Sequence, residues 1–184
     1  VPSPCNINEY ITFGSFNNYA KVTIETVEVW CKILLRVNNS RMYIKSKVFG
    51  EEVFREKVYC SFEQFGVDRD RIFLQGQVNS LHDHLAAYGK VDIALDTFPY
   101  NGTTTTCEAL WMGVPVISLC GGTHRSRVGS SILKQLDLAF LTAGNVRAYI
   151  KCAISLSNDK PALARLRSSL RDVLASSTVC DAVR

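Results

Sequence analysis

Segments of strand pattern and of helix pattern alternate along the whole chain, and this alternation is the feature that most restricts its fold. Short apolar and β-branched runs predict strands at residues 10–16, 41–45, 71–75, 91–96, 114–119 and 139–141. Apolar residues at helical spacing predict helices at residues 24–37, 51–65, 81–88, 104–112, 126–136, 145–156 and 161–174. Because the strand segments show little polar–apolar alternation, both of their faces are expected to be buried. The sequence therefore predicts an α/β fold with a doubly wound, mostly parallel, Rossmann-like sheet.

The composition is that of an ordinary globular domain. The chain has 184 residues, of which 47% are hydrophobic and 21% charged, and we expect residues 1–184 to form one domain. Its net charge is +4, but lysine and arginine form no run, so nucleic acid is not an expected partner. No apolar stretch reaches the roughly 18 residues that a membrane span requires, so no membrane association is expected. An anionic small ligand suits this charge balance.

The cysteines indicate a reducing compartment. Seven cysteines are widely spaced, and none forms a C-x-x-C pair. They are typical of reduced thiols in a cytoplasmic protein, with the nucleus as a second location. No cysteine lies at ligand spacing from a histidine, so neither a metal nor a cofactor is expected. The pair His82 and His84 is a minor alternative metal site.

The segment from Leu95 to Glu108 carries the strongest functional signal. An apolar strand ends in a turn that contains Pro99, Asn101 and Gly102, four threonines follow, and a helix begins. The N-terminus of a helix presents unpaired N–H groups and a positive dipole end, which favour phosphate. Glu108, about one turn into the helix, is placed to accept hydrogen bonds from a ribose diol. A threonine cap without a ligand is the alternative for this run taken alone.

Other loops that follow predicted strands contain cationic and imidazole side chains. Lys21 lies beyond the first strand, where an ammonium would stabilise a diphosphate, although a solvated surface lysine is the alternative. His84 follows the third strand and would contact a base, or would simply be a surface histidine. A second glycine-rich turn at residues 121–127 opens another helix and contains His124.

Several well-known nucleotide motifs are absent. The chain has no G-x-G-x-x-G after the first strand, no P-loop and no nucleophile elbow. A nicotinamide cofactor and ATP hydrolysis are therefore disfavoured. What remains is a site for a nucleoside diphosphate, with no obvious general base.

These motifs closely resemble the C-terminal catalytic half of the O-GlcNAc transferases and SPINDLY proteins, glycosyltransferase family 41. The resemblance covers nearly the whole chain and is most specific in the block Asp-Thr-Phe-Pro-Tyr-x-Gly-Thr-Thr-Thr-Thr-Cys-Glu at residues 96–108. It implies the C-terminal, Rossmann-like domain of a two-domain GT-B fold. It also implies an inverting, metal-independent reaction in which a protein serine or threonine hydroxyl displaces a nucleoside diphosphate from a nucleotide sugar.

The resemblance also implies roles for particular residues. Lys21 would bind the diphosphate and stabilise its departure, which makes it the one catalytic residue expected. Asn18 stands where O-GlcNAc transferases often have a glutamine that contacts the donor. His84 would lie beside the nucleoside, and Glu108 would bind the ribose. The turn that binds the phosphates would consist of Thr103, Thr104 and Thr105.

The family pattern includes parts that this chain does not contain. An N-terminal catalytic half and tetratricopeptide repeats shape the acceptor side, so we expect the chain to be a fragment that binds nucleotide weakly and transfers nothing alone. UDP-GlcNAc is the donor implied first, and GDP-fucose, the SPINDLY donor, is the alternative. A non-catalytic nucleotide-sugar module and a sugar-nucleotide 2-epimerase are competing functions, and His124 is the only loose candidate for acid–base work in the latter.

Overall fold

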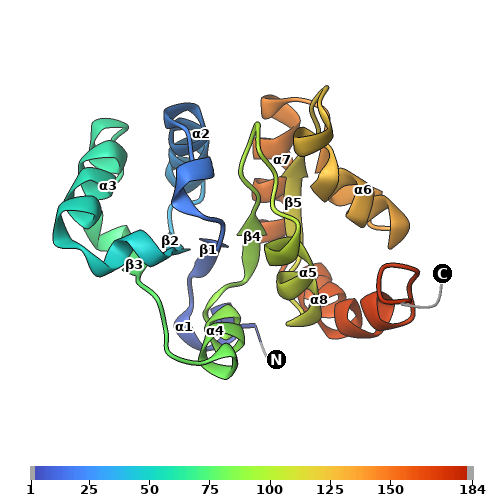
Figure 1. Ribbon diagram of the computed structural model, residues 1–184. Coiled ribbons are helices and arrows are strands. Elements are labelled where there is room, and N and C mark those ends of the chain that lie inside the picture. The colour runs from blue at the N-terminus through green and yellow to red at the C-terminus, as the bar shows by residue number, and fades with distance from the viewer. Residues whose placement is uncertain (1–2, 182–184) are drawn as a thin grey trace.

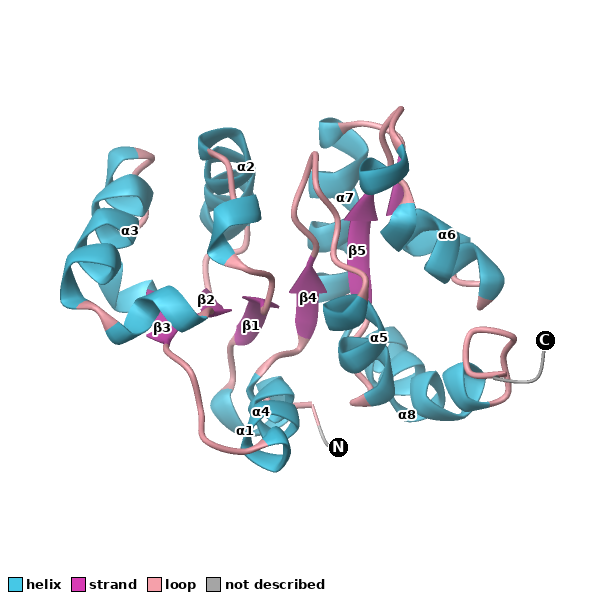
Figure 2. Cartoon of the chain, viewed as in Figure 1, coloured by secondary structure: helices cyan, strands magenta, loops and turns pink. Residues whose placement is uncertain are grey.

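The computed structural model describes residues 3–181 and contains a six-stranded parallel sheet, seen in Figures 1 and 2. The strand order is β3-β2-β1-β4-β5-β6, with every neighbouring pair parallel. The strands are β1 (Ile11–Ser15), β2 (Ser40–Lys45), β3 (Ile72–Gln75), β4 (Ile93–Leu95), β5 (Val116–Leu119) and β6 (Thr142–Ala143). This order confirms the predicted doubly wound sheet. The outermost residues of the predicted domain, 1–2 and 182–184, lie outside the described part.

Helices cover both faces of the sheet. They are α1 (Cys5–Asn8), α2 (Ile24–Arg36), α3 (Glu52–Gln64), α4 (Leu81–Ala86), α5 (Thr104–Trp111), α6 (Val128–Gln135), α7 (Val146–Asn158) and α8 (Lys160–Ala175). Helix α2 packs against α3 and α7 on one face, while α5 packs against α6 and α8 on the other side of the sheet (Figure 1). Right-handed crossovers on opposite faces of the two half-sheets produce this division.

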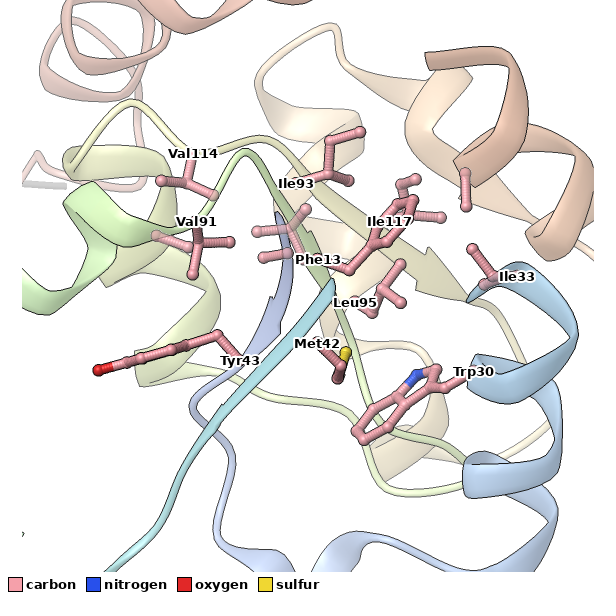
Figure 3. Close-up of a cluster of buried hydrophobic side chains, with 14 of the residues drawn as sticks. Phe13, Trp30, Ile33, Met42, Tyr43, Val91, Ile93, Leu95, Val114 and Ile117 are labelled. Atoms are coloured by element: carbon pink, nitrogen blue, oxygen red, sulfur yellow. The ribbon is translucent and has the colours of Figure 1, made fainter. Parts of the chain in front are cut away.

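The apolar core lies on both sides of the central strands. All five residues of β1 are buried, in agreement with the predicted two-sided burial. Figure 3 shows Trp30 and Ile33 of α2 on one side of the strands and Tyr43 and Val91 on the other. Trp30 and Ile33 are fully buried. Full burial of a large apolar side chain stabilises a fold by about 1.5–3 kcal/mol, so this core holds the strand ends in fixed positions.

Three element predictions differ from the structure. The last strand was expected at residues 139–141, but these residues form a 3-10 turn and β6 begins at Thr142. The helix expected at 81–88 ends at Ala86 and continues as a 3-10 turn to Lys90. No helix was predicted before residue 24, but Cys5–Asn8 form the single helical turn α1. The helix predicted at residues 51–65 ends at Gln64, and Gly66 just beyond it has φ 81°, a value typical of glycine after a helix end.

Candidate functional site

The candidate site lies where the strand order reverses. Strands β1 and β4 are neighbours in the sheet although two strands separate them in sequence. The connections leave these two strands on opposite faces, which opens a crevice at their carboxyl ends. The loop after β1 contains Asn17, Asn18 and Lys21, and the loop after β4 leads from Asp96 to α5. These two sequence-predicted loops therefore meet at one edge of the sheet.

A buried carboxylate shapes the loop after β4. Asp96 is 1% exposed and accepts hydrogen bonds from the backbone N–H of Gly102 (2.7 Å) and of Thr97 (2.9 Å). It also accepts from the Ser118 hydroxyl (2.7 Å) and the Asn17 amide (3.4 Å). Burial raises the pKa of Asp96 to about 6, and these hydrogen bonds oppose that increase. The carboxylate thus fixes the turn that delivers the chain to α5.

The four threonines have different surroundings. Thr103 and Thr104 are exposed, and no side chain caps the first turn of α5. The Thr105 hydroxyl donates to Asn17 Oδ1 at 3.0 Å, and the Thr106 hydroxyl donates to the Gly102 carbonyl at 3.0 Å. The exposed hydroxyls and uncapped N–H groups at this helix end suit an anion. The Thr105 hydroxyl instead ties α5 to the loop after β1.

Gly102 is the point at which these loops approach most closely. A Cβ there would collide with the Thr105 hydroxyl and would lie 2.7 Å from Asn17 Oδ1. We expect Gly102→Ala to break the Asn17–Thr105 contact and lower the free energy of unfolding by about 1–3 kcal/mol. Urea unfolding measures this change. Gly122→Ala is the matched control, since its Cβ meets nothing within 4 Å, and an equal effect of both substitutions would contradict the prediction.

Lys21 extends from the 3-10 turn Tyr19–Lys21 toward the loop after β4. Its Nζ donates to the Asn101 carbonyl at 3.1 Å and lies 4.2 Å from the centroid of the Tyr100 ring. Burial lowers the pKa of Lys21, and the negative charge of Asp96 opposes this shift. Asn18 caps the same turn by accepting from the Ala20 N–H at 3.1 Å. The structure therefore holds an ammonium group beside the loop that opens α5.

A second polar cluster joins β2, α4 and α5. His84 Nε2 lies 3.0 Å from Glu108 Oε2, and the Tyr88 hydroxyl donates to the same oxygen at 3.1 Å. Lys45 Nζ lies 2.8 Å from His84 Nδ1. Burial and the nearby Glu108 raise the pKa of Tyr88. The predicted nucleoside residue His84 and the predicted ribose residue Glu108 are thus in direct contact.

Three residues at the site were missed by sequence reasoning. Asn17, Lys45 and Asp96 each stand at or just beyond the end of a strand, which is the signal that would have found them. Their partners lie far away in sequence, as with Asn17 and Asp96, so only the folded chain reveals their contacts.

The other histidines lie apart from this cluster. His82 is exposed, with Asp83 3.6 Å away. His124 is exposed on a 3-10 turn whose Arg125 carbonyl accepts from Asn101 N–H at 2.9 Å. Across residues 3–181, no three side chains of His, Cys, Asp or Glu come together in a group able to hold a metal ion. No helix in that part of the chain combines the length and apolar character needed to cross a membrane.

Comparison with known proteins identifies close relatives. The model of Glycosyl transferase family 41 matches residues 6–184. A SPINDLY protein of Arabidopsis thaliana, named a probable UDP-N-acetylglucosamine–peptide N-acetylglucosaminyltransferase, is 44% identical over 180 residues, which cover 98% of this chain and 20% of that protein. The UDP-N-acetylglucosamine–peptide N-acetylglucosaminyltransferase of Caenorhabditis elegans is 31% identical over 175 residues, 95% of this chain and 15% of that protein. The chain thus spans about a fifth or less of the length of these relatives.

Solved structures support the same assignment. A mutant of the Thermobaculum terrenum O-GlcNAc transferase superposes with a TM-score of 0.88 at 37% identity, covering 91% of this chain and 32% of that one. The C-terminal domain of LpcC, a group 1 glycosyltransferase of Francisella tularensis, has a TM-score of 0.67 at 14% identity and shares the fold over 93% of this chain and 89% of that one. These matches confirm the predicted Rossmann-like domain of GT-B glycosyltransferases. Because the family model matches nearly the whole length of this chain, the chain belongs to glycosyltransferase family 41.

Proposed function

We propose that this chain is the donor-binding part of an inverting, metal-independent protein O-glycosyltransferase that transfers GlcNAc from UDP-GlcNAc to serine or threonine. One observation carries the proposal: Lys21 contacts the loop that leads into α5, the N-terminus of α5 has no side-chain cap, and His84 contacts Glu108 of the same helix. This arrangement offers a cationic group, an anion-binding helix end and a ribose-binding carboxylate in that spatial order. A nucleoside diphosphate presents the complementary groups in the same order.

In the proposed reaction, an acceptor hydroxyl oxygen attacks the anomeric carbon of the sugar while the bond from that carbon to the β-phosphate oxygen breaks, and the hydroxyl proton leaves to solvent. Negative charge then develops on the departing diphosphate. The Lys21 ammonium stabilises this charge, together with the helix end formed by Thr103 and Thr104. Thr105 contributes through its hydrogen bond to Asn17, which holds α5 in place.

The remaining roles concern the nucleoside. Glu108 has an acceptor-only carboxylate that suits the two ribose hydroxyls. His84 contacts Glu108 and lies on the nucleoside side of the crevice. Asn18 lines a cavity together with His84, and this supports assigning Asn18 to donor binding as well. We assign all of these residues to donor binding and Lys21 also to the chemical step.

The acceptor protein and the rest of the enzyme complete this proposal. An N-terminal catalytic half and tetratricopeptide repeats would form the opposite wall of the cleft and hold the acceptor. The free cysteines are in keeping with a location in the cytoplasm or nucleus. They are Cys5, Cys31, Cys60, Cys107, Cys120, Cys152 and Cys180.

Calorimetry with UDP and with GDP, side by side, tests the proposed donor. We expect the full-length protein to bind UDP more tightly than GDP, and the substitution Glu108→Gln to weaken binding about 10-fold, because the ribose loses a charged acceptor. The matched control is Glu56→Gln, on the exposed surface of α3 and away from the crevice. Tighter binding of GDP would indicate the SPINDLY-type donor GDP-fucose, and no binding of either nucleotide would contradict the proposal.

A further inference from the structure

A cavity of about 580 Å³ lies beside the His84–Glu108 pair, at the carboxyl ends of β1 and β2. Its lining comprises Phe16, Asn18, Lys45, Ser46, Lys47, Val48, Glu51, Gln77 and His84. Phe16 and Val48 give it an apolar wall, and the Phe16 ring is stacked on Tyr88 at 4.0 Å between centroids. A flat apolar wall of this kind suits a planar aromatic ligand.

The unusual member of this lining is Lys45, which sequence reasoning did not single out. It is only 8% exposed, and among residues 3–181 no carboxylate oxygen lies within 4.0 Å of its ammonium group. Burial lowers the pKa of Lys45, and the more distant Glu108 opposes the shift. A buried ammonium group without a carboxylate partner is costly unless acceptors satisfy its N–H groups.

Within residues 3–181, the hydrogen-bond partner of the Lys45 ammonium group is His84. An ammonium group only donates, so His84 Nδ1, 2.8 Å away, must be the acceptor. The ring proton then resides on Nε2, which donates to Glu108 at 3.0 Å. Two of the three N–H donors of Lys45 remain for a ligand in the cavity.

The position of the cavity indicates which part of a nucleotide it would take. His84 belongs both to the cavity lining and to the contact with Glu108, the proposed ribose ligand. Glu108 in turn lies in α5, whose N-terminus is the proposed phosphate site. A nucleotide with its phosphates at α5 and its ribose at Glu108 would therefore direct its base toward Lys45.

We propose that this cavity receives the nucleobase and that Lys45 selects bases that carry a carbonyl oxygen over bases that carry an exocyclic amino group at the same position. Uracil and guanine present such an oxygen, while cytosine and adenine present an amino donor that would face the ammonium group. Glu51 and Gln77, which also line the cavity, offer acceptors for the adjacent ring N–H of uracil or guanine. This inference rests on the proposed function, and it adds the chemical rule by which the donor base is chosen.

Matched nucleotide pairs test this rule. UDP and CDP differ only in the 4-oxo or 4-amino pyrimidine edge, and inosine diphosphate and ADP differ only in the corresponding purine edge. Within each pair that binds to the full-length protein, we expect calorimetry to show a Kd for the nucleotide with the oxo group that is lower by about 10-fold or more. In Lys45→Met, which keeps the length and apolar character of the stem, the ratio should fall to about 3-fold or less.

Two further measurements keep the outcomes distinct. Lys134→Met, on the exposed surface of α6, is the matched control and should keep the wild-type preference. Thermal unfolding of Lys45→Met establishes whether this variant is folded. If it is not, Lys45→Arg takes its place: it retains charged donors and should preserve part of the preference for oxo bases. Wild-type binding without an oxo preference, or a preference that persists in Lys45→Met, overturns the role of Lys45 and leaves the proposed function standing. Failure of all four nucleotides to bind contradicts the proposed function itself.

Discussion

Replacing Lys21 with alanine in the full-length protein is expected to lower kcat by about 100- to 1000-fold, with a much smaller loss of donor affinity. The Asn101 carbonyl and the Tyr100 ring hold the ammonium group beside the loop that leads to the N-terminus of α5. It therefore needs no rearrangement as charge develops on the diphosphate. An interaction that strengthens in the transition state affects kcat more than binding. Transfer of labelled sugar at saturating donor measures kcat, and calorimetry with the nucleoside diphosphate measures affinity.

The matched control for this experiment is Lys32→Ala. Lys32 is an exposed lysine of α2 that pairs with Glu28 across one helical turn, far from the chemistry proposed here. Its replacement should leave kcat and affinity unchanged. If Lys21→Ala weakened nucleotide binding but left the rate of transfer intact, Lys21 would have no role in the chemical step. A protein that binds nucleotide through Lys21 yet shows no transfer in its wild-type form would instead be a non-catalytic nucleotide-sugar module.

Much of the fold could be predicted from the sequence because its strands are short, apolar and separated by well-marked helices. The helix predicted from residue 24, for example, does begin at Ile24, and the Thr23 side chain caps it by accepting from the Thr26 N–H. The last strand was placed too early because Ala139–Leu141 is apolar, as a strand would be. The position of this strand is set by its pairing with β5, in which Ser118 aligns with Thr142, while Ala139–Leu141 form a 3-10 turn. Such registers depend on tertiary contacts that periodicity does not contain.

The candidate site shows the same division between local and long-range information. Lys21, His84 and Glu108 were singled out because each follows a strand or opens a helix, and local pattern is enough to see that. Lys45 was not, because its significance depends on a partner 39 residues away. Asp96 was quoted within the motif without a role of its own, since its four donors include residues up to 79 positions away from it in the sequence.

Asp96→Ala is expected to lower the free energy of unfolding by about 3 kcal/mol or more at pH 7. The substitution removes the acceptor shared by two backbone N–H groups, one hydroxyl and one amide, all in a fully buried setting. Urea unfolding gives the loss of stability. Ser118→Ala is the graded comparison, because it removes one of the four donors and should cost about 1 kcal/mol. Equal stability of Asp96→Ala and wild type would show that the turn does not depend on this carboxylate.

The pH dependence of stability shows whether burial, which raises the pKa of Asp96, outweighs the hydrogen bonds, which lower it. Its pKa is about 6 in the folded chain, against about 3.9 for an unfolded aspartate, so between these values the native state binds more protons than the unfolded state. The contribution of Asp96 to the free energy of unfolding should therefore fall by about 2 kcal/mol as pH rises from 4 to 6, out of a total change of about 3 kcal/mol, and should stay level above about pH 7. Measured by urea unfolding, the gap between wild type and Asp96→Ala should narrow over this interval. A gap that widens with pH would mean that the four hydrogen bonds outweigh burial and hold the pKa of Asp96 below its ordinary value.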